Sequence, residues 1–312
     1  MGTPDFAALA AKVNNWKRWG NEDQRGTLNH IDEAALQRGA ASVRQGKLFS
    51  LGLSFDRNGP QIPGSYRDNP QLYVTALGQP MSPEYPSCCF TDDVIHMHAQ
   101  CATQWDALAH VHYDGELYNG LRPEQVLTTG GALRNGIEHL ARPGIMARAV
   151  LLDIARLEGV ERLPPEYEIT PDDLNHCCEH QGVRLAKGDI VLVRTGHIRW
   201  FTVDGDRARF NGLQPGLSGA CAEWLYDHSA AAVCADNVAV ERIGPNVMSR
   251  PEPMPLHMLC LRDMGMPLGE MWDLEALAAD CAADGQYTFL LAAPPLALTG
   301  AVGSPVNPLA LK

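Results

Sequence analysis

The sequence contains no C-x-x-C pair, which excludes a zinc ribbon or a related site built on closely spaced cysteines. Its nine cysteines are an odd number, and they include two adjacent pairs, Cys88–Cys89 and Cys177–Cys178. Adjacent cysteines rarely bridge one another, so we expect reduced thiols, as in a cytoplasmic protein.

Long apolar runs and basic clusters are missing as well. No uninterrupted apolar stretch approaches the ~20 residues of a membrane-spanning helix, and the first residues lack the basic-then-apolar order of a signal peptide. With a formal net charge of −12 and no compensating basic run, the chain is not expected to bind nucleic acid. We therefore expect a cytoplasmic protein that binds a small molecule rather than a membrane or a nucleic acid.

Signatures of several enzyme classes are also missing. No G-x-S-x-G, phosphate-binding loop or G-x-G-x-x-G occurs in a usable context. The 312 residues, 45% of them apolar and 20% charged, are enough for a sizeable core. No repeat or linker divides them, so we predict a single domain over residues 1–312.

Apolar runs bounded by turn residues predict the interior strands. They span residues 149–154, 190–196, 231–236 and 287–291. Residues 52–90 are rich in Gly, Pro, Ser and Asn, which predicts long loops around short strands such as 73–76. Residues 94–98 alternate and fit a further strand.

Helices are predicted between these strands. Thr170 and Pro171 form a good N-terminus for a helix through His180. Further helices are expected over 218–228, capped by Ser218, and over 274–284. Strands and helices interleave without strict alternation, which indicates an α/β fold with a mixed sheet and flanking helices.

The segment from Gln100 to His110, Q-C-A-T-Q-W-D-A-L-A-H, gathers two amides, a hydroxyl, a carboxylate and an imidazole among small and apolar residues. Burying these groups is costly unless each finds a partner, such as a metal ion, a substrate or a hydrogen-bond network. Gln104 and Asp106 share a face if the chain is extended, and Asp106 and His110 share one if it is helical. A strand running into a helix near Asp106 would aim all three at one point.

This segment resembles the signature H-x-G-T-H-x-D-x-x-x-H of the cyclase family that includes bacterial kynurenine formamidases and isatin hydrolases. Thr103, Asp106 and His110 match the signature, while Gln100 and Gln104 replace its two earlier histidines. The likeness extends from W-G-N-E-D-Q-R-G-T-L-N-H-I near the start to G-S-P-V-N-P-L-A-L-K at the end. It implies a swivelling β/β/α-type domain with a mixed, barrel-like sheet.

The family's later metal-site elements are a histidine that opens a helix and a glutamate after a G-x-P segment. His257 and Glu270 in H-M-L-C-L-R-D-M-G-M-P-L-G-E resemble them. The resemblance implies a divalent metal held by Asp106, His257 and Glu270, together with Gln104, Gln100 or both.

Other interpretations of these residues stay open on sequence alone. Asp106 also suits an N-cap at a strand-to-helix junction, and His110 also fits a core histidine bonded to the backbone. Proton transfer suits His110 at least as well, because imidazole titrates near neutral pH. The resemblance implies that role beside the metal. Glu270 is expected to be a metal ligand or a catalytic carboxylate, since a buried glutamate needs a cation or a proton.

The two glutamines bear on which metal is bound. An amide oxygen is a weaker zinc ligand than imidazole, so manganese is preferred, with zinc or magnesium as alternatives. The same glutamines also fit hydrogen bonds to a substrate in a protein that has lost the metal. His96 and His98 lie just upstream but out of register with the signature, and we expect them to face solvent or pack in loops.

Several residues are predicted to bind substrate. Trp105 and Trp200 would form an apolar wall for a cyclic or aromatic substrate, with Thr103 and His197 as further contacts. His197 and Trp200 follow a predicted strand in T-G-H-I-R-W-F, and strand ends often line pockets. A plain strand-exit loop fits this segment equally well.

These features lead to three hypotheses. The first is a metal-dependent hydrolase that cleaves a small cyclic or aromatic amide or lactone, with His110 as general acid or base. The second keeps the metal but makes the reaction a lyase, dehydratase or cyclisation step, and the third is a metal-free binding protein. The resemblance also implies a homodimer or homotetramer. The aromatic residues between Leu53 and Phe90 fit a subunit contact or a lid.

Overall fold

The computed structural model describes residues 5–312. The α-helices are α1 (Phe6–Val13), α2 (Glu33–Ala41), α3 (Pro123–Val126), α4 (Glu138–Ala141), α5 (Ile154–Leu157), α6 (Pro171–Gln181), α7 (Arg199–Thr202), α8 (Arg207–Phe210), α9 (Cys221–Asp227), α10 (Pro255–His257) and α11 (Glu275–Asp284). Short 3₁₀ turns are η1 (Gly26–His30), η2 (Tyr118–Gly120) and η3 (Val247–Ser249), and η4 (Met258–Met264) is a wider π-helical segment.

The strands are β1 (Leu48–Ser50), β2 (Gln71–Pro80), β3 (Cys89–His96), β4 (Gln104–Asp106), β5 (Leu127–Thr128), β6 (Gly131–Ala132), β7 (Met146–Asp153), β8 (Glu168–Ile169), β9 (Ile190–Arg194), β10 (Gly216–Leu217), β11 (Ala232–Ala235), β12 (Leu268–Glu270), β13 (Thr288–Ala292), β14 (Gly303–Pro305) and β15 (Leu309–Leu311). Nine of them form one curled sheet in the order β1-β15-β13-β7-β9-β11-β12-β4-β14. In this sheet β7, β9, β11 and β12 run parallel, and the other neighbours pair antiparallel.

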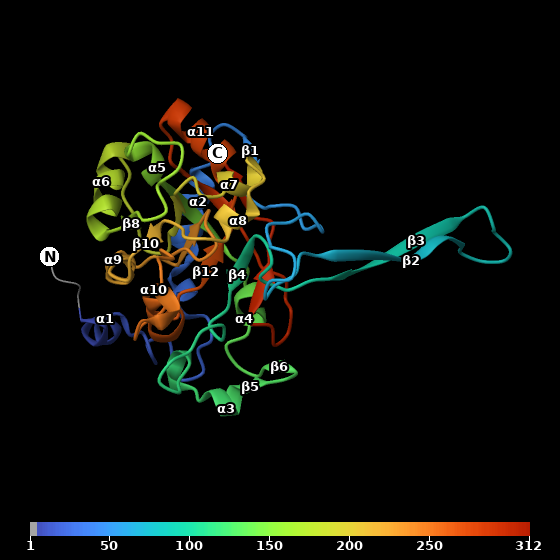
Figure 1. Ribbon diagram of the computed structural model, residues 1–312, viewed down its shortest axis with the longest axis horizontal. Helices are drawn as coiled ribbons and strands as arrows, with labels where there is room; N and C mark the ends of the chain where they lie inside the picture. The colour runs from blue at the N-terminus through green and yellow to red at the C-terminus, as the bar shows by residue number, and fades with distance from the viewer. Residues whose placement is uncertain (1–4) are drawn as a thin grey trace.

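Apolar side chains cover both faces of the sheet, because successive residues of its central strands point to opposite sides. On one face Val150, Val191 and Val233 belong to a core completed by α1, α6 and α9. On the other face Leu151 and Leu192 join a second core with residues of α11. The predicted mixed α/β fold with flanking helices is confirmed (Figure 1).

Most elements predicted from the sequence are present. The four interior strands correspond to β7, β9, β11 and β13, and the predicted helices to α6, α9 and α11. Thr170 and Asp173 form a reciprocal capping box at α6, as the cap signal indicates. The predicted Ser218 cap is wrong, since α9 starts after Ala220 without a side-chain cap.

The prediction of loops around short strands over residues 52–90 is only half right. Residues 71–96 form a hairpin of β2 and β3 that projects far from the rest of the molecule (Figure 1), and we call this hairpin the arm. Two irregularities in the pairing follow Val74 and Ala76. The arm's alternating residues match the strand prediction for 73–76 and most of that for 94–98.

Two sequence-based expectations concern absences. All nine cysteines are free thiols, as expected from their spacing. Between residues 5 and 312 we find no helix that combines the length and apolar character of a membrane span.

Candidate active site

The short strand β4 places the polar side chains of the signature segment. Gln104 and Asp106 share one of its faces, and Trp105 points to the other. The segment after Asp106 does not adopt the helix that would place Asp106 and His110 on one face. The strand ends in a turn in which His110 N–H donates to Ala107 O at 2.9 Å. The turn still returns His110 to the site, with its Nε2 3.7 Å from Asp106 Oδ1.

The neighbouring strand β12 brings Glu270 opposite Gln104. The Gln104 amide N–H donates to Glu270 Oε2. His257, at the end of α10, approaches from the side. Its Nε2 lies 3.2 Å from Glu270 Oε1 and 3.8 Å from Asp106 Oδ2. Ligand atoms of Asp106, His257 and Glu270 all lie within 4.8 Å of one another, and we call these three residues the acid–histidine cluster.

The cluster is buried and short of hydrogen-bond donors. Neither Asp106 carboxylate oxygen has a hydrogen-bond partner among the described residues, and neither does Gln104 Oε1. Burial and the nearby charge of Glu270 raise the pKa of Asp106 well above its usual value. Buried acids without donors need a cation or a proton. Three orphaned oxygens beside an imidazole and a second carboxylate therefore fit a divalent metal ion.

Glu241 was not singled out from the sequence, yet it sets the orientation of His257. One of its oxygens lies 2.5 Å from His257 Nδ1 and also accepts the His257 backbone N–H, and the other accepts the Leu256 N–H. Burial lowers the pKa of His257, but hydrogen bonds to Glu241 and Glu270 outweigh it and raise the pKa to about 10. An Nδ1–H held by a carboxylate leaves Nε2 facing the cluster, which is the usual arrangement of a metal-binding histidine.

Backbone strain borders the cluster on both sides. Val240, just before Glu241, has φ 58°, and Met271, just after Glu270, has φ 57°. Left-handed backbone is costly for residues other than glycine and gathers at functional sites. Thr103 helps to hold this geometry, because its hydroxyl donates to Met271 O at 2.6 Å and accepts Leu53 N–H at 2.8 Å.

His110 is more accessible than the acid–histidine cluster, with 21% of its side chain exposed. Burial of its ring lowers its pKa to about 4. The imidazole is therefore neutral at pH 7 and able to accept a proton from a group beside Asp106.

Gln100 lies at the rim of the site rather than in the cluster. Its Nε2 is 2.5 Å from where a Cβ on Gly303 would stand, so a larger residue opposite Asp106 on β14 would displace the Gln100 side chain. The Gln100 carbonyl accepts a hydrogen bond from Arg67 Nη1 at 3.1 Å. The positive charge of Arg67 acts on both Asp106 and His110, which makes it a rim residue that the sequence did not reveal.

Two predicted substrate contacts have structural roles instead. Trp105 is fully buried on the core face of β4, packs edge-on against Trp272 at 5.1 Å and donates its indole N–H to Ala293 O. The Thr103 hydroxyl proton and one of its two lone pairs are bonded to the backbone. Both side chains thus have structural contacts of their own, and their contact with substrate stays a prediction.

The T-G-H-I-R-W-F segment also lies apart from the cluster. His197 is buried, stacks on Phe210 at 5.5 Å and bonds Phe210 O through Nε2. Trp200 lies between the guanidinium groups of Arg162 and Arg209, 4.1 and 4.5 Å from its ring. The hydrogen bond and ring contacts of these two residues are made with Phe210, Arg162 and Arg209 rather than with the acid–histidine cluster, and their contact with substrate stays a prediction.

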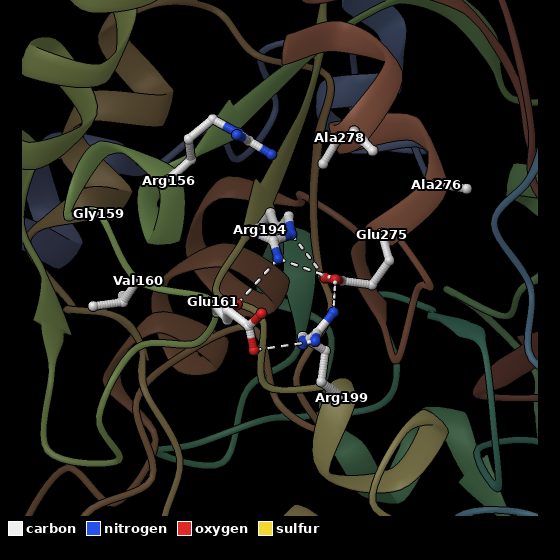
Figure 2. A pocket seen from close by; sticks show the side chains of 10 residues that line it. Arg156, Gly159, Val160, Glu161, Arg194, Arg199, Glu275, Ala276 and Ala278 are labelled. Atoms are coloured by element: carbon white, nitrogen blue, oxygen red, sulfur yellow. Dashed lines mark hydrogen bonds and ion pairs between the residues drawn. The ribbon is translucent and has the colours of Figure 1, made fainter. Parts of the chain in front are cut away.

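A cavity of about 660 Å³ opens elsewhere, beside α11 (Figure 2). We call it the arginine pocket. Arg194 and Arg199 both bond the Glu275 carboxylate there, and Arg194 also reaches Asp153 at 2.8 Å. Each buried charge is matched by an opposite one. None of the acid–histidine cluster lines this cavity.

The chain belongs to the cyclase family. Residues 50–242 match the family model described as "Putative cyclase". A crystal structure described as a novel cyclase shares 38% identity over 97% of this chain and 99% of its own, with a TM-score of 0.86. The family resemblance expected from Gln100–His110 is thus confirmed.

More distant structures share the fold. Isatin hydrolase A from Ralstonia solanacearum is 20% identical, covers 89% of this chain and 94% of its own, and has a TM-score of 0.61. A structure described as a predicted metal-dependent hydrolase from Bacillus stearothermophilus is 16% identical, covers 86% and 98%, and has a TM-score of 0.55. No curated protein matches the chain. The chain thus has a cyclase-family fold related to that of metal-dependent hydrolases.

Proposed function

We propose that this protein is a metal-dependent hydrolase that cleaves a small cyclic or aromatic amide or lactone. One observation carries the proposal: the buried Asp106 carboxylate has no hydrogen-bond donor and lies beside His257 and Glu270. In a metal-free binding protein the Asp106 carboxylate would have no hydrogen-bond donor, and the single His257 imidazole would be the nearby partner of two buried acids.

Each residue of the site has a proposed task. Asp106, His257 and Glu270 would hold the ion, and a divalent ion there would supply the Lewis acidity that polarises a carbonyl and activates water. Glu241 keeps the His257 Nε2 lone pair turned toward the cluster. His110 accepts the proton of the attacking water at Nε2 and passes it to the leaving group.

Manganese is the proposed metal. The support is a donor set of two carboxylates and one imidazole, with the free Gln104 Oε1 beside them. Oxygen-rich sets suit manganese or magnesium better than zinc. Gln104→His should therefore raise zinc affinity relative to manganese, measured by competition with a chromogenic chelator. Equal gains for both metals would contradict the preference.

Isatin is the first substrate to test, because the structures of similar fold are named isatin hydrolases. Manganese-loaded protein should convert isatin, or another cyclic amide or lactone, to a product heavier by one water in mass spectrometry. A product of unchanged mass, or one that has lost water, would assign a lyase or cyclisation step to the same site. Protein that holds no metal after loading with excess manganese and desalting above pH 7 rules out both reactions.

A further inference from the structure

We propose that a small pocket between the segment before η1 and the helix α4 binds a phosphate group through Arg25 and Arg142. The pocket is a cavity of about 280 Å³, and we call it the basic pocket. None of the acid–histidine cluster lines it. This inference therefore does not depend on the reaction proposed above.

Two segments that are distant in the sequence build the basic pocket. Arg25 directly precedes η1, where Thr27 N–H donates to Gly265 O at 2.9 Å and fixes the backbone. His139 and Arg142 come from the other side. They lie three residues apart on the helical backbone of α4 and its C-cap, so their side chains are neighbours. The three side chains thus start from backbone that the fold already holds in place.

Arg25 carries a half-buried positive charge that has no counter-ion in contact. Its Nε is buried and has no hydrogen-bond acceptor within residues 5–312. Burial lowers the pKa of Arg25, and the nearby charge of Asp23 opposes this only in part. A guanidinium group that loses water without gaining an acceptor is costly to the fold. An anion that enters the basic pocket would offset that cost.

The two acidic residues that line the cavity already have other partners. Asp23 accepts three hydrogen bonds of 2.8 to 2.9 Å from neutral donors. Glu22 forms an ion pair with Arg134 at 3.1 Å. Within the described chain neither acid forms an ion pair with Arg25 or Arg142. The two guanidinium groups of the basic pocket can therefore bind an external anion.

Phosphate is the anion that these donors favour. A guanidinium group presents a planar fork of N–H donors that matches the oxygens of a phosphate group. Two such groups with the His139 imidazole suit an anion that carries more than one negative charge. The net charge of −12 repels anions elsewhere on the chain.

The size of the cavity limits the ligand to a small phosphate compound. Its volume of about 280 Å³ lies just below the range of roughly 300–1,000 Å³ that is usual for sites of drug-sized ligands. Inorganic phosphate and a short phosphate monoester share the chemistry that the basic pocket recognises, and both are therefore used as probes.

The test measures phosphate binding to the full chain by isothermal titration calorimetry. Arg25→Gln and Arg142→Gln each remove one guanidinium group from the basic pocket. Arg44→Gln is the matched control, because Arg44 is exposed and distant from this cavity in the sequence and in its lining. Asp106→Asn tests whether phosphate binds at a metal in the acid–histidine cluster instead. Melting curves check that each variant is folded.

We expect inorganic phosphate to bind equally well to the wild type, to Arg44→Gln and to Asp106→Asn. Each variant of the basic pocket should weaken binding by about 10- to 100-fold, the usual contribution of hydrogen bonds to a charged group. Acetate should bind about tenfold more weakly than phosphate, because it carries one charge where a phosphate group carries more than one at neutral pH.

Glycerol phosphate identifies the form in which the phosphate group is bound. Tighter binding of this monoester than of inorganic phosphate, lost in Arg25→Gln, would support the site and assign it to an esterified phosphate. Equal binding of the two would support it for the free ion. A wild type that binds neither probe at millimolar concentration would overturn the proposal. So would an equal loss of affinity in Arg44→Gln, or the loss of binding in Asp106→Asn.

Discussion

Two buried groups of charges in this protein differ in how their carboxylates are satisfied. In the arginine pocket, Asp153 and Glu275 receive guanidinium hydrogen bonds from Arg194 at 2.7 to 3.0 Å. In the acid–histidine cluster, Asp106 receives no hydrogen bond from any described residue. The two groups therefore differ in whether an arginine is hydrogen-bonded to the buried carboxylates.

The comparison separates a structural charge cluster from a binding site. A carboxylate that already has its cation contributes to the fold and has no need of a ligand. A buried carboxylate without a cation lowers the stability of the fold. Such a costly arrangement is typical of sites where a bound ligand offsets the cost. The strained Val240 and Met271 on either side of the cluster agree with this interpretation.

The largest effect is expected from one isosteric substitution in each group of buried charges, which tests whether the two groups differ in function. Asp106→Asn should abolish metal binding and turnover without lowering the melting temperature, because it removes an unpaired buried charge. Asp153→Asn should keep metal content and turnover per folded molecule but lower the melting temperature. Both variants are compared by metal analysis, a turnover assay and thermal unfolding, which separate a metal ligand from a residue that stabilises the fold. Equal metal retention in both would remove Asp106 from the ligand set.

The second test concerns His110. His110→Ala should lower turnover by ~10²–10⁴, the usual contribution of a general acid or base, while metal stays bound. The exposed His112 two residues on is the matched control, and His112→Ala should leave turnover unchanged. Loss of metal in His110→Ala would make His110 a ligand instead, and wild-type turnover would remove it from the mechanism.

The third test is made in the arginine pocket. Arg194→Ala leaves the fully buried Asp153 and the Glu275 carboxylate without their main cation. Breaking a buried pair in this way should lower the free energy of unfolding by about 3–5 kcal/mol in urea titrations. Arg156, half-exposed on the same Asp153, is the control, and its alanine variant should cost at most about 1 kcal/mol. A comparable loss of unfolding free energy in Arg194→Ala and Arg156→Ala would mean that the burial of the arginine does not determine its contribution to stability.

The smallest expected effect is at Glu241. Glu241→Gln keeps one of the two acceptor oxygens, replaces the other by an amide NH2, and removes the charge that holds His257 Nδ1–H. Residues that orient a metal ligand typically contribute 10- to 100-fold to affinity, so we expect manganese affinity to fall by about that factor in calorimetric titrations. Glu161→Gln, at the exposed edge of the arginine pocket, is the control and should leave manganese affinity unchanged. Unchanged affinity in Glu241→Gln would reduce Glu241 to a purely structural role.

Local sequence patterns determined the central strands, the capped helix α6 and the shared face of Gln104 and Asp106. These features depend on residues within one element, whose periodicity and capping are written in a few neighbouring positions. The Gln100–His110 pattern also pointed to the family. The same local logic was misleading for His110, which a turn rather than a helix brings back to Asp106.

Tertiary structure alone decided what each face of β4 meets. Alternation places Trp105 opposite Gln104 and Asp106, but only the sheet order shows that its side is core. Glu241 and Arg67 carry no signal in their own segments, because their roles arise from contacts with His257 and Gln100, 16 and 33 residues away. The arm shows the same limit: the sequence predicts short strands at 73–76 and 94–98, but only the fold shows that they pair in one hairpin that projects from the body (Figure 1).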